Sequence, residues 1–303
     1  DEAGTALTTG DNNVAVGYAA GDALTTATDS TFVGYLAGSA TTDGNHNTGI
    51  GSNALAANTG GQNTAVGRDA LAANTTASFN TAVGRSAGAA LTEGNRNVAI
   101  GKDALLTDTL GSRSVAVGLG TLQSQNFTTA TDAYNTGVGH AAGNSITTGF
   151  QNTYIGGLAG DAATASVENV AVGYQALSAD TLGSKSVAVG RMALLSQNLT
   201  TATDVYNVAV GHNAGQQVTV GTINTLIGGL AGDALTTGDS NVAVGYVALS
   251  ADTQGDRSVA IGAGALKTQN FTTATSAYNI GIGYDAGASV TTAIYNTLIG
   301  GLA

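Results

Sequence analysis

The sequence contains no cysteine, no proline and no tryptophan, and only 10% of its 303 residues are charged. Without cysteine, the chain can form no disulfide and has no thiolate to act as nucleophile or metal ligand. No apolar run approaches the roughly 20 residues that a membrane-spanning helix needs, so membrane insertion is not predicted. The formal net charge of -11 argues against binding to nucleic acid or anionic membranes, because like charges repel.

What the chain has in abundance is one short motif. NVAVG at 13–17 returns at 169–173, 207–211 and 241–245, and variants such as NTGIG, NTAVG and SVAVG lie between these copies. Aligned on the closing glycine, from Gly17 to Gly300, the motif occurs 17 times, at steps of 17 residues except for one step of 16 and three of 21. A fixed period of this kind is typical of repeat proteins, in which each unit stacks on its neighbours.

The three longer steps define a larger unit. Each contains a four-residue insertion, within QNFTTATDAY, QNLTTATDVY or QNFTTATSAY, and these segments recur every 72 residues. Residues 97–168, 169–240 and 241–303 are therefore three successive copies of a four-coil superrepeat, the last one shorter. We predict a single continuous repeat domain over residues 1–303.

Each motif has the pattern of a short strand. Val or Ile always precedes the glycine, and Val, Thr or Ile lies two positions earlier, which is the alternation of β-branched residues expected in a strand. A turn rich in Thr, Gly, Asn and Asp follows, and we expect two short strands and two turns per coil. The sequence predicts an all-β parallel β-solenoid, or β-roll, of about 17 coils, with 17 residues per coil and a 21-residue coil in every fourth position.

The middle residue of the motif is small or apolar and never charged. By the two-residue period of a strand, it points away from the face that carries Val16 and its equivalents. We expect that valine face to fill the coil's interior and the middle residues to pack against another copy of the chain, although an exposed alanine face is the alternative. The predicted interface residues are Ala15, Ala65, Ala82, Ala99, Ala116, Ala171, Ala188, Ala209, Ala243 and Ala260.

The motif also resembles a known repeat. N-[TVI]-x-[VI]-G followed by Ala is similar to the NSVAIG-like head repeats of trimeric autotransporter adhesins, and NTAVGRDAL at 63–71 and NVAVGYQAL at 169–177 are similar to segments of bacteriophage tail fibres. The resemblance covers nearly the whole chain. It implies a left-handed β-roll, three chains wound into one trunk, and display at a cell surface or on a virion. The 17- and 21-residue coils depart from the adhesin pattern.

Nothing in the sequence points to catalysis. The three histidines are His46, His140 and His212, of which the last two occupy the same repeat position four coils apart. The carboxylates lie mostly in turns such as TTDGNHN, where turn chemistry explains them, and a weak calcium site in a turn is the remaining alternative. We predict no enzymatic activity, no cofactor and no metal site.

The insertions are the best candidates for contact with a partner. They contain the sequons that begin at Asn126, Asn198 and Asn270, and they add aromatic residues such as Phe127 and Tyr134. Glycosylation, contact with a cell-surface glycan or receptor, packing on a neighbouring fibre, and a plain surface loop are the open alternatives.

These observations predict a non-enzymatic structural fibre, extracellular or on a virion, that serves as a shaft or adhesive trunk and has copies of itself as partners. The alternative is a filament that polymerises head to tail, because the start DEAGTALTTGDN resembles the coil segment GGLAGDALTTGDS at 228–240 and would complete the last coil. An ice-binding solenoid is disfavoured, since the columns of Thr are expected to face inward.

Overall fold

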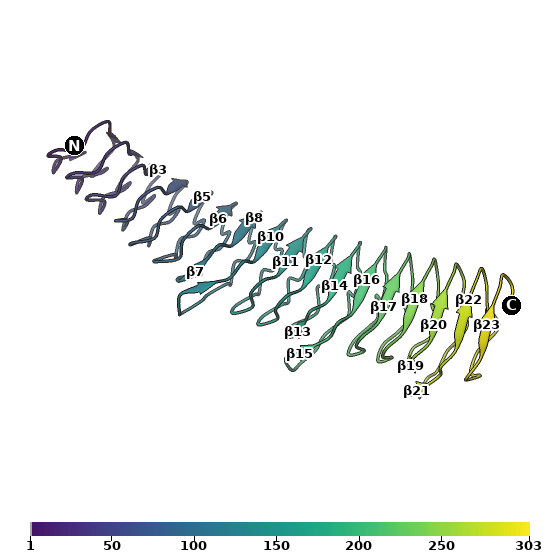
Figure 1. Cartoon of the computed structure of the whole chain (residues 1–303). Helices are drawn as coiled ribbons and strands as arrows, with labels where there is room; N and C mark the ends of the chain where they lie inside the picture. The colour runs from purple at the N-terminus through teal and green to yellow at the C-terminus, as the bar shows by residue number, and fades with distance from the viewer. Residues whose placement is uncertain (1) are drawn as a thin grey trace. The chain divides into compact units, whose positions relative to one another are not determined.

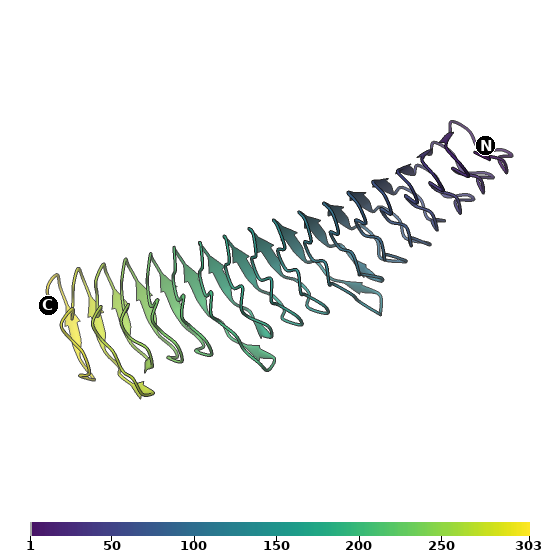
Figure 2. The same cartoon turned by 180° about the vertical axis from the view of Figure 1, so that it is seen from behind.

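The computed structural model describes residues 2–303, and every regular element in that range is a strand of two or three residues. The chain divides into two compact units, one ending at Gln151 and one beginning at Asn152. Within each unit, one short strand per coil recurs along the chain (Figures 1 and 2). The boundary falls inside the superrepeat 97–168, and the prediction of one continuous domain stays a prediction.

In the first unit the motif strands pair in parallel with the next in the chain. These strands are β1 (Val14–Val16), β2 (Thr31–Val33), β3 (Thr48–Ile50), β4 (Thr64–Val66), β5 (Thr81–Val83), β6 (Val98–Ile100), β8 (Val115–Val117) and β10 (Thr136–Val138). Equivalent residues face one another, as in the pair Ala65 and Ala82. The columns of the aligned sequence are therefore columns in space.

The second unit repeats this arrangement. Its motif strands are β11 (Thr153–Ile155), β12 (Val170–Val172), β14 (Val187–Val189), β16 (Val208–Val210), β17 (Thr225–Ile227), β18 (Val242–Val244), β20 (Val259–Ile261), β22 (Ile280–Ile282) and β23 (Thr297–Ile299). The predicted all-β parallel solenoid of about 17 coils is confirmed, since eight motif strands in the first unit and nine in the second account for all 17 copies of the motif.

Each 21-residue coil has a second strand, which pairs with one in the coil before it. β7 (Gly111–Ser112) pairs with β9 (Thr131–Asp132), β13 (Gly183–Ser184) with β15 (Thr203–Asp204), and β19 (Gly255–Asp256) with β21 (Thr275–Ser276). The other coils have no second strand among the described residues, so the expectation of two strands in every coil is wrong. After the glycine the chain turns through left-handed residues instead, such as Asn53 and Leu55, with φ of 58° and 55°.

The predicted facing of the strand is reversed. The middle residues point into the coil and are buried: Ala65, Ala82, Ala99, Ala116, Ala171, Ala188, Ala209, Ala243 and Ala260 are at most 1% exposed, and Ala15 in the first coil is half-buried. The flanking Val, Ile and Thr residues lie outside and are at least partly exposed. The alanines are therefore not available as an interface between copies. Most middle residues are small because the space between the strand and the opposite wall of the coil is narrow.

Large and small residues compensate for one another inside the coil. Tyr154 replaces the middle alanine and is fully buried, and a Cβ on Gly160 would lie only 2.4 Å from its ring. Gly137 has the opposite role, since a Cβ there would lie 3.0 Å from the side chain of Leu122. The alternation of Leu and Gly four residues after the motif glycine thus follows from filling one fixed volume.

The motif asparagine joins successive coils. Asn80 Oδ1 accepts a hydrogen bond from the backbone N–H of Asn97 at 2.8 Å, and Asn80 Nδ2 donates to the carbonyl oxygen of Gly94 at 2.8 Å. Both bonds are buried and recur along the column, for example at Asn169. The asparagines therefore form a ladder along the column, in which these amides bind the backbone of the next coil.

The motif glycine is required by close approach between coils. Gly34 has a φ of 141°, and a Cβ there would lie 2.5 Å from the carbonyl oxygen of Gly51 in the next coil. No side chain fits at that distance, so the column of glycines sets how closely coils can stack.

Candidate interaction surface

The outward side of the motif strands forms a flat, largely apolar face, here called the outer face. Its two central columns are the Thr or Val that opens each strand and the Val or Ile that closes it. Ile100 and Val83, for example, are 38% and 37% exposed. Because a Thr column faces outward, the reason given above for disfavouring an ice-binding face does not hold.

Two further columns flank the outer face. One is the residue before the motif asparagine, called the pre-asparagine column, and the other is the residue after the motif glycine, called the post-glycine column. Nine of the ten tyrosines lie in these columns and are exposed: Tyr18, Tyr35, Tyr134, Tyr174, Tyr206, Tyr246, Tyr278, Tyr284 and Tyr295. The outer face is therefore bordered by aromatic side chains on both sides.

Exposed hydrophobic residues concentrate on these four columns. Of the 26 large hydrophobic side chains that are exposed among residues 2–303, 21 belong to them. Eight strands at ~4.8 Å, spanning about seven residues across, give each unit a face of roughly 700 Å², with an apolar strip along its centre and a mixture of aromatic, polar and charged residues along its borders. The area of this face is close to the ~800 Å² that each partner buries in a standard interface, whose centre is typically apolar and whose rim is polar.

Flanking side chains of successive coils also stack on each other. Tyr18 and Tyr35 have ring centroids 5.4 Å apart and nearly parallel planes, and Tyr278 and Tyr295 repeat this arrangement at 5.5 Å. The guanidinium of Arg96 lies 5.3 Å from the ring centroid of Phe79. These contacts hold the borders of the outer face in place before any partner binds.

The insertion coils carry a charged cluster on their surface. Beside β9, Arg113 donates a hydrogen bond to the Asp132 carboxylate and lies over the ring of Tyr134. In the next superrepeat, Lys185 Nζ donates to Asp204 Oδ2 at 2.7 Å and lies over the ring of Tyr206. Hydrogen bonding to Asp204 raises the pKa of Lys185, and the same bond lowers the pKa of Asp204. Both groups are exposed, so the pair orients the loop more than it stabilises the fold.

Inside each insertion coil lies a buried polar network that the sequence did not suggest. Asp180 Oδ1 accepts from the backbone N–H of Gly183 and of Leu199, and its Oδ2 accepts from Gln197 Nε2 at 2.6 Å. Gln197 Nε2 also donates to Ser186 Oγ at 3.1 Å. The same residues recur as Asp108, Ser114 and Gln125, and as Asp252, Ser258 and Gln269.

Burial raises the pKa of Asp180 and Asp108, and hydrogen bonds to the carboxylates oppose that shift in part. The network explains why serine replaces the motif asparagine at positions 114, 186 and 258, since the glutamine side chain needs that space. The co-occurrence of Asp, Ser and Gln at fixed spacing was the available signal, but Asp before a turn is usually explained by turn chemistry.

The sequon asparagines lie at the start of the insertions. The Oδ1 atoms of Asn126, Asn198 and Asn270 each accept from a threonine of the preceding coil at 3.0–3.1 Å. Asn198 is exposed and the other two are half-buried. Of the predicted surface aromatics, Phe127 and Phe271 are buried at 6% exposure, whereas Tyr134 and Tyr278 are exposed. Glycosylation of these asparagines stays a prediction.

The histidines lie on the borders of the outer face. His140 and His212 are in the post-glycine column, and His46 in the pre-asparagine column lies 3.7 Å from Asp29. Within residues 2–303, no three or more His, Cys, Asp or Glu side chains are grouped so as to hold a metal ion.

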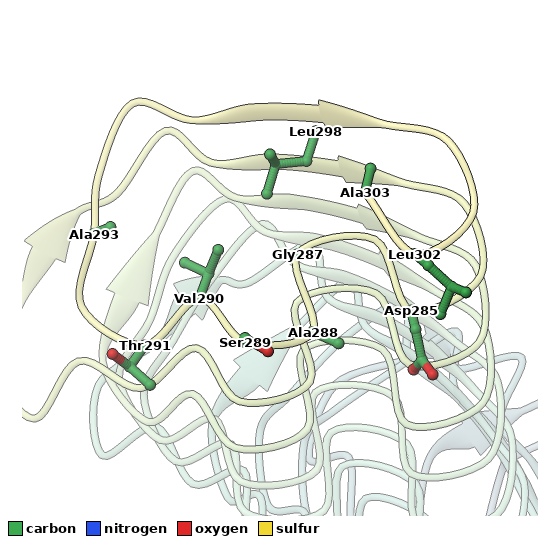
Figure 3. A pocket seen from close by; sticks show the side chains of 10 residues that line it. All are labelled: Asp285, Gly287, Ala288, Ser289, Val290, Thr291, Ala293, Leu298, Leu302 and Ala303. Atoms are coloured by element: carbon green, nitrogen blue, oxygen red, sulfur yellow. The ribbon is translucent and has the colours of Figure 1, made fainter.

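A pocket of about 580 Å³ opens in the coil that ends at Ala303. Val290 and Leu298 point into it from opposite walls, as Figure 3 shows. The apolar residues that line it are equivalent to interior residues of the other coils, where the following coil covers them.

Comparison with protein-family models, with curated proteins and with solved structures found no match to this chain. No helix suited to crossing a membrane occurs in the part of the chain that the structure describes.

Proposed function

We propose that this protein is a non-enzymatic structural fibre, an extracellular or virion-borne shaft or adhesive trunk, whose chains associate through the outer face. The observation that carries the proposal is the concentration of exposed hydrophobic residues on one face of a solenoid whose interior is already filled. Burying that face would remove apolar surface from water without any rearrangement of the coil.

A second copy of the chain is the partner that fits this face best. Two parallel copies have the same spacing of roughly 4.8 Å between coils, so their side chains can stay in step over many coils. A globular partner has no such period and would match the face over a few coils only. The similarity to trimeric adhesin head repeats supports three chains, a left-handed coil and display outside the cell.

Catalysis has little to support it. The interior holds hydrogen-bonded networks in place of open polar cavities, and the ionisable groups of the surface are spread along the columns in pairs. A binding or supporting role needs no such site. The proposed partners are therefore further copies of the chain and a cell-surface glycan or receptor, without a cofactor.

The test is the particle mass of the purified chain, measured by sedimentation equilibrium. We expect oligomers, with three chains favoured. Val83→Asp with Ile100→Asp places two charges on the outer face, and we expect monomers with an unchanged circular dichroism spectrum. The matched control, Thr128→Asp with Thr129→Asp, places the same charges on the exposed insertion, and we expect the wild-type mass. A monomeric wild type, or an equal mass for all three proteins, would refute association through the outer face.

The second arrangement is a head-to-tail filament, in which a coil of another copy would stack on Val290 and Leu298. Electron microscopy of the same preparation separates the two, since head-to-tail stacking gives filaments of open-ended length and lateral association gives particles of one length.

A further inference from the structure

Two tyrosines of the post-glycine column differ from the other tyrosines of that column, Tyr284 included, because the column holds glycine in the coil before each of them. Tyr174 and Tyr246 are 72 residues apart at equivalent positions and are 49% and 62% exposed. Within residues 2–303, no other ring stacks on either of them. Each therefore presents a ring that is not already used within the chain.

A glycine in the preceding coil lies beside each of these rings. A Cβ on Gly157 would lie 3.6 Å from Cδ2 of Tyr174, and one on Gly229 would lie 3.5 Å from Cδ2 of Tyr246. Only an added methyl group at either glycine would reach the ring in ordinary van der Waals contact, so the coil before each tyrosine places no side chain over its ring. Much of each ring therefore stays open to solvent.

Between the two rings lie hydrogen-bonding groups. Arg191 and His212 occupy the two coils that separate Tyr174 from Gly229, and Arg191 Nη1 is 3.3 Å from His212 Nε2. The column therefore runs Gly, Tyr, Arg, His, Gly, Tyr, and the two tyrosines are four coils or about 19 Å apart. Arg offers a planar fork of donors, and each ring pairs an apolar surface with a polar hydroxyl.

We propose that this column is a binding site for an extended, uncharged polysaccharide, with Tyr174 and Tyr246 as stacking platforms and Arg191 and His212 as hydrogen-bonding groups between them. The C–H faces of a sugar ring fit the open side of a tyrosine, and sugar hydroxyls accept from the guanidinium. The net charge of -11 disfavours a polyanion as ligand. A linear chain matches two platforms in line along one edge.

The site lies within one chain, so it depends on the fold and not on fibre assembly. Copies that pack on the central columns leave the post-glycine column at the rim of the interface. Binding can therefore succeed or fail whether or not the chains associate.

Affinity electrophoresis tests the site. The intact chain is run in native gels that contain dextran, glycogen, hydroxyethyl cellulose, galactomannan or heparin, each in a separate gel. We expect retardation by at least one neutral polymer and none by heparin. Tyr174→Ala with Tyr246→Ala should weaken binding about tenfold or more for each ring removed. The matched control, Tyr18→Ala with Tyr35→Ala, removes a stacked pair and should bind as the wild type does.

A second variant tests the geometry while both rings stay. Gly157→Val with Gly229→Val places a side chain beside each ring and should tilt the rings. We expect a loss of retardation similar to that of the tyrosine double variant. Sedimentation mass is measured for every variant, and loss of binding at unchanged mass supports the platforms. The proposal is overturned by retardation in heparin only, by none in any gel, by equal retardation of wild type and the tyrosine variant, or by a binding loss that accompanies a loss of mass.

Discussion

At the scale of single residues, the motif asparagine stabilises the stack more than its small side chain suggests. Asn80→Ala removes the two buried bonds to Asn97 N–H and Gly94 C=O, and we expect a loss of about 2–4 kcal/mol in the free energy of unfolding. Asn80→Ser should cost about half as much, because Ser30 shows that a serine Oγ still accepts from the next coil. Equilibrium denaturation in urea measures both.

Asn12→Ala serves as the control for this series. Asn12 is exposed, bonds to the exposed Asp29 side chain and has a left-handed φ of 60° that asparagine adopts more readily than alanine, so its loss should cost no more than about 1 kcal/mol. Equal effects of Asn80→Ala and Asn12→Ala would contradict the role of the buried ladder.

Residues of the pre-asparagine column have a left-handed backbone conformation, and a second prediction follows from it. Ile223 has a φ of 60° and its side chain is 58% exposed, and a β-branched residue is strained in this conformation. Ile223→Asn should raise the free energy of unfolding by roughly 1 kcal/mol, because asparagine adopts it readily. Ile223→Thr is the matched control, since it is polar but still β-branched. An equal gain in the free energy of unfolding from Ile223→Thr would show that polarity, and not the backbone conformation, causes the effect.

At the scale of elements, the insertion coil depends on a directional chain of hydrogen bonds. Asn207 Nδ2 donates to Gln197 Oε1, and Gln197 Nε2 donates to Asp180 Oδ2. In Asp180→Asn, two N–H donors face each other however the side-chain amides in this chain of bonds are flipped. We therefore expect a loss of about 1–3 kcal/mol in the free energy of unfolding at neutral pH. Replacing Asp180 by Val together with Gln197 by Leu copies the apolar pair Val218 and Leu235, which occupy successive coils in the same column. This double variant should recover the stability that Asp180→Asn loses.

The same aspartate makes stability depend on pH. Burial raises the pKa of folded Asp180, so the folded chain holds this proton more tightly than the unfolded chain, whose Asp titrates near 3.9. Its contribution to the free energy of unfolding therefore falls as pH rises from about 4 through the raised folded pKa, and is constant above it. The Val and Leu double variant should lack that decrease. Denaturation series between pH 4 and 8 measure it, and identical slopes for the two proteins would contradict the assignment.

Much of this fold could be predicted from the sequence, because the period and the β-branched alternation fix strands, stacking and coil number. The facing of the strand could not, since Ala65 on one side and Val66 on the other are both apolar and hydropathy does not separate them. Volume decides it: the coil is too narrow for Val opposite Leu55 or Leu71, so the alanines lie inside. The role of Asp180 was missed because Gln197, which joins it to Ser186, lies in the next coil, where sequence distance hides the contact.

At the scale of the whole molecule, the superrepeat should behave as one removable unit. Deleting residues 169–240 joins Glu168 to Asn241, which restores the motif register and every column, because these 72 residues are one four-coil superrepeat. Each coil contacts its neighbours only, so stability is a sum over coils and interfaces. We expect the shortened chain to fold, with the denaturant m-value lower by roughly a quarter, the share of residues removed.

Deleting residues 169–231 is the matched control for this experiment. It removes a similar length but joins Glu168 to Gly232, which places every later column out of step across the junction. The glycine before the junction would then no longer face the carbonyl oxygen that its column requires: Gly156 lies beside Gly173 O, at 2.5 Å from an added Cβ, and no motif glycine takes the place of Gly173. We expect this variant to unfold in two separate transitions, or to aggregate. A single transition at the stability of the in-register deletion would show that the columns do not set the stack.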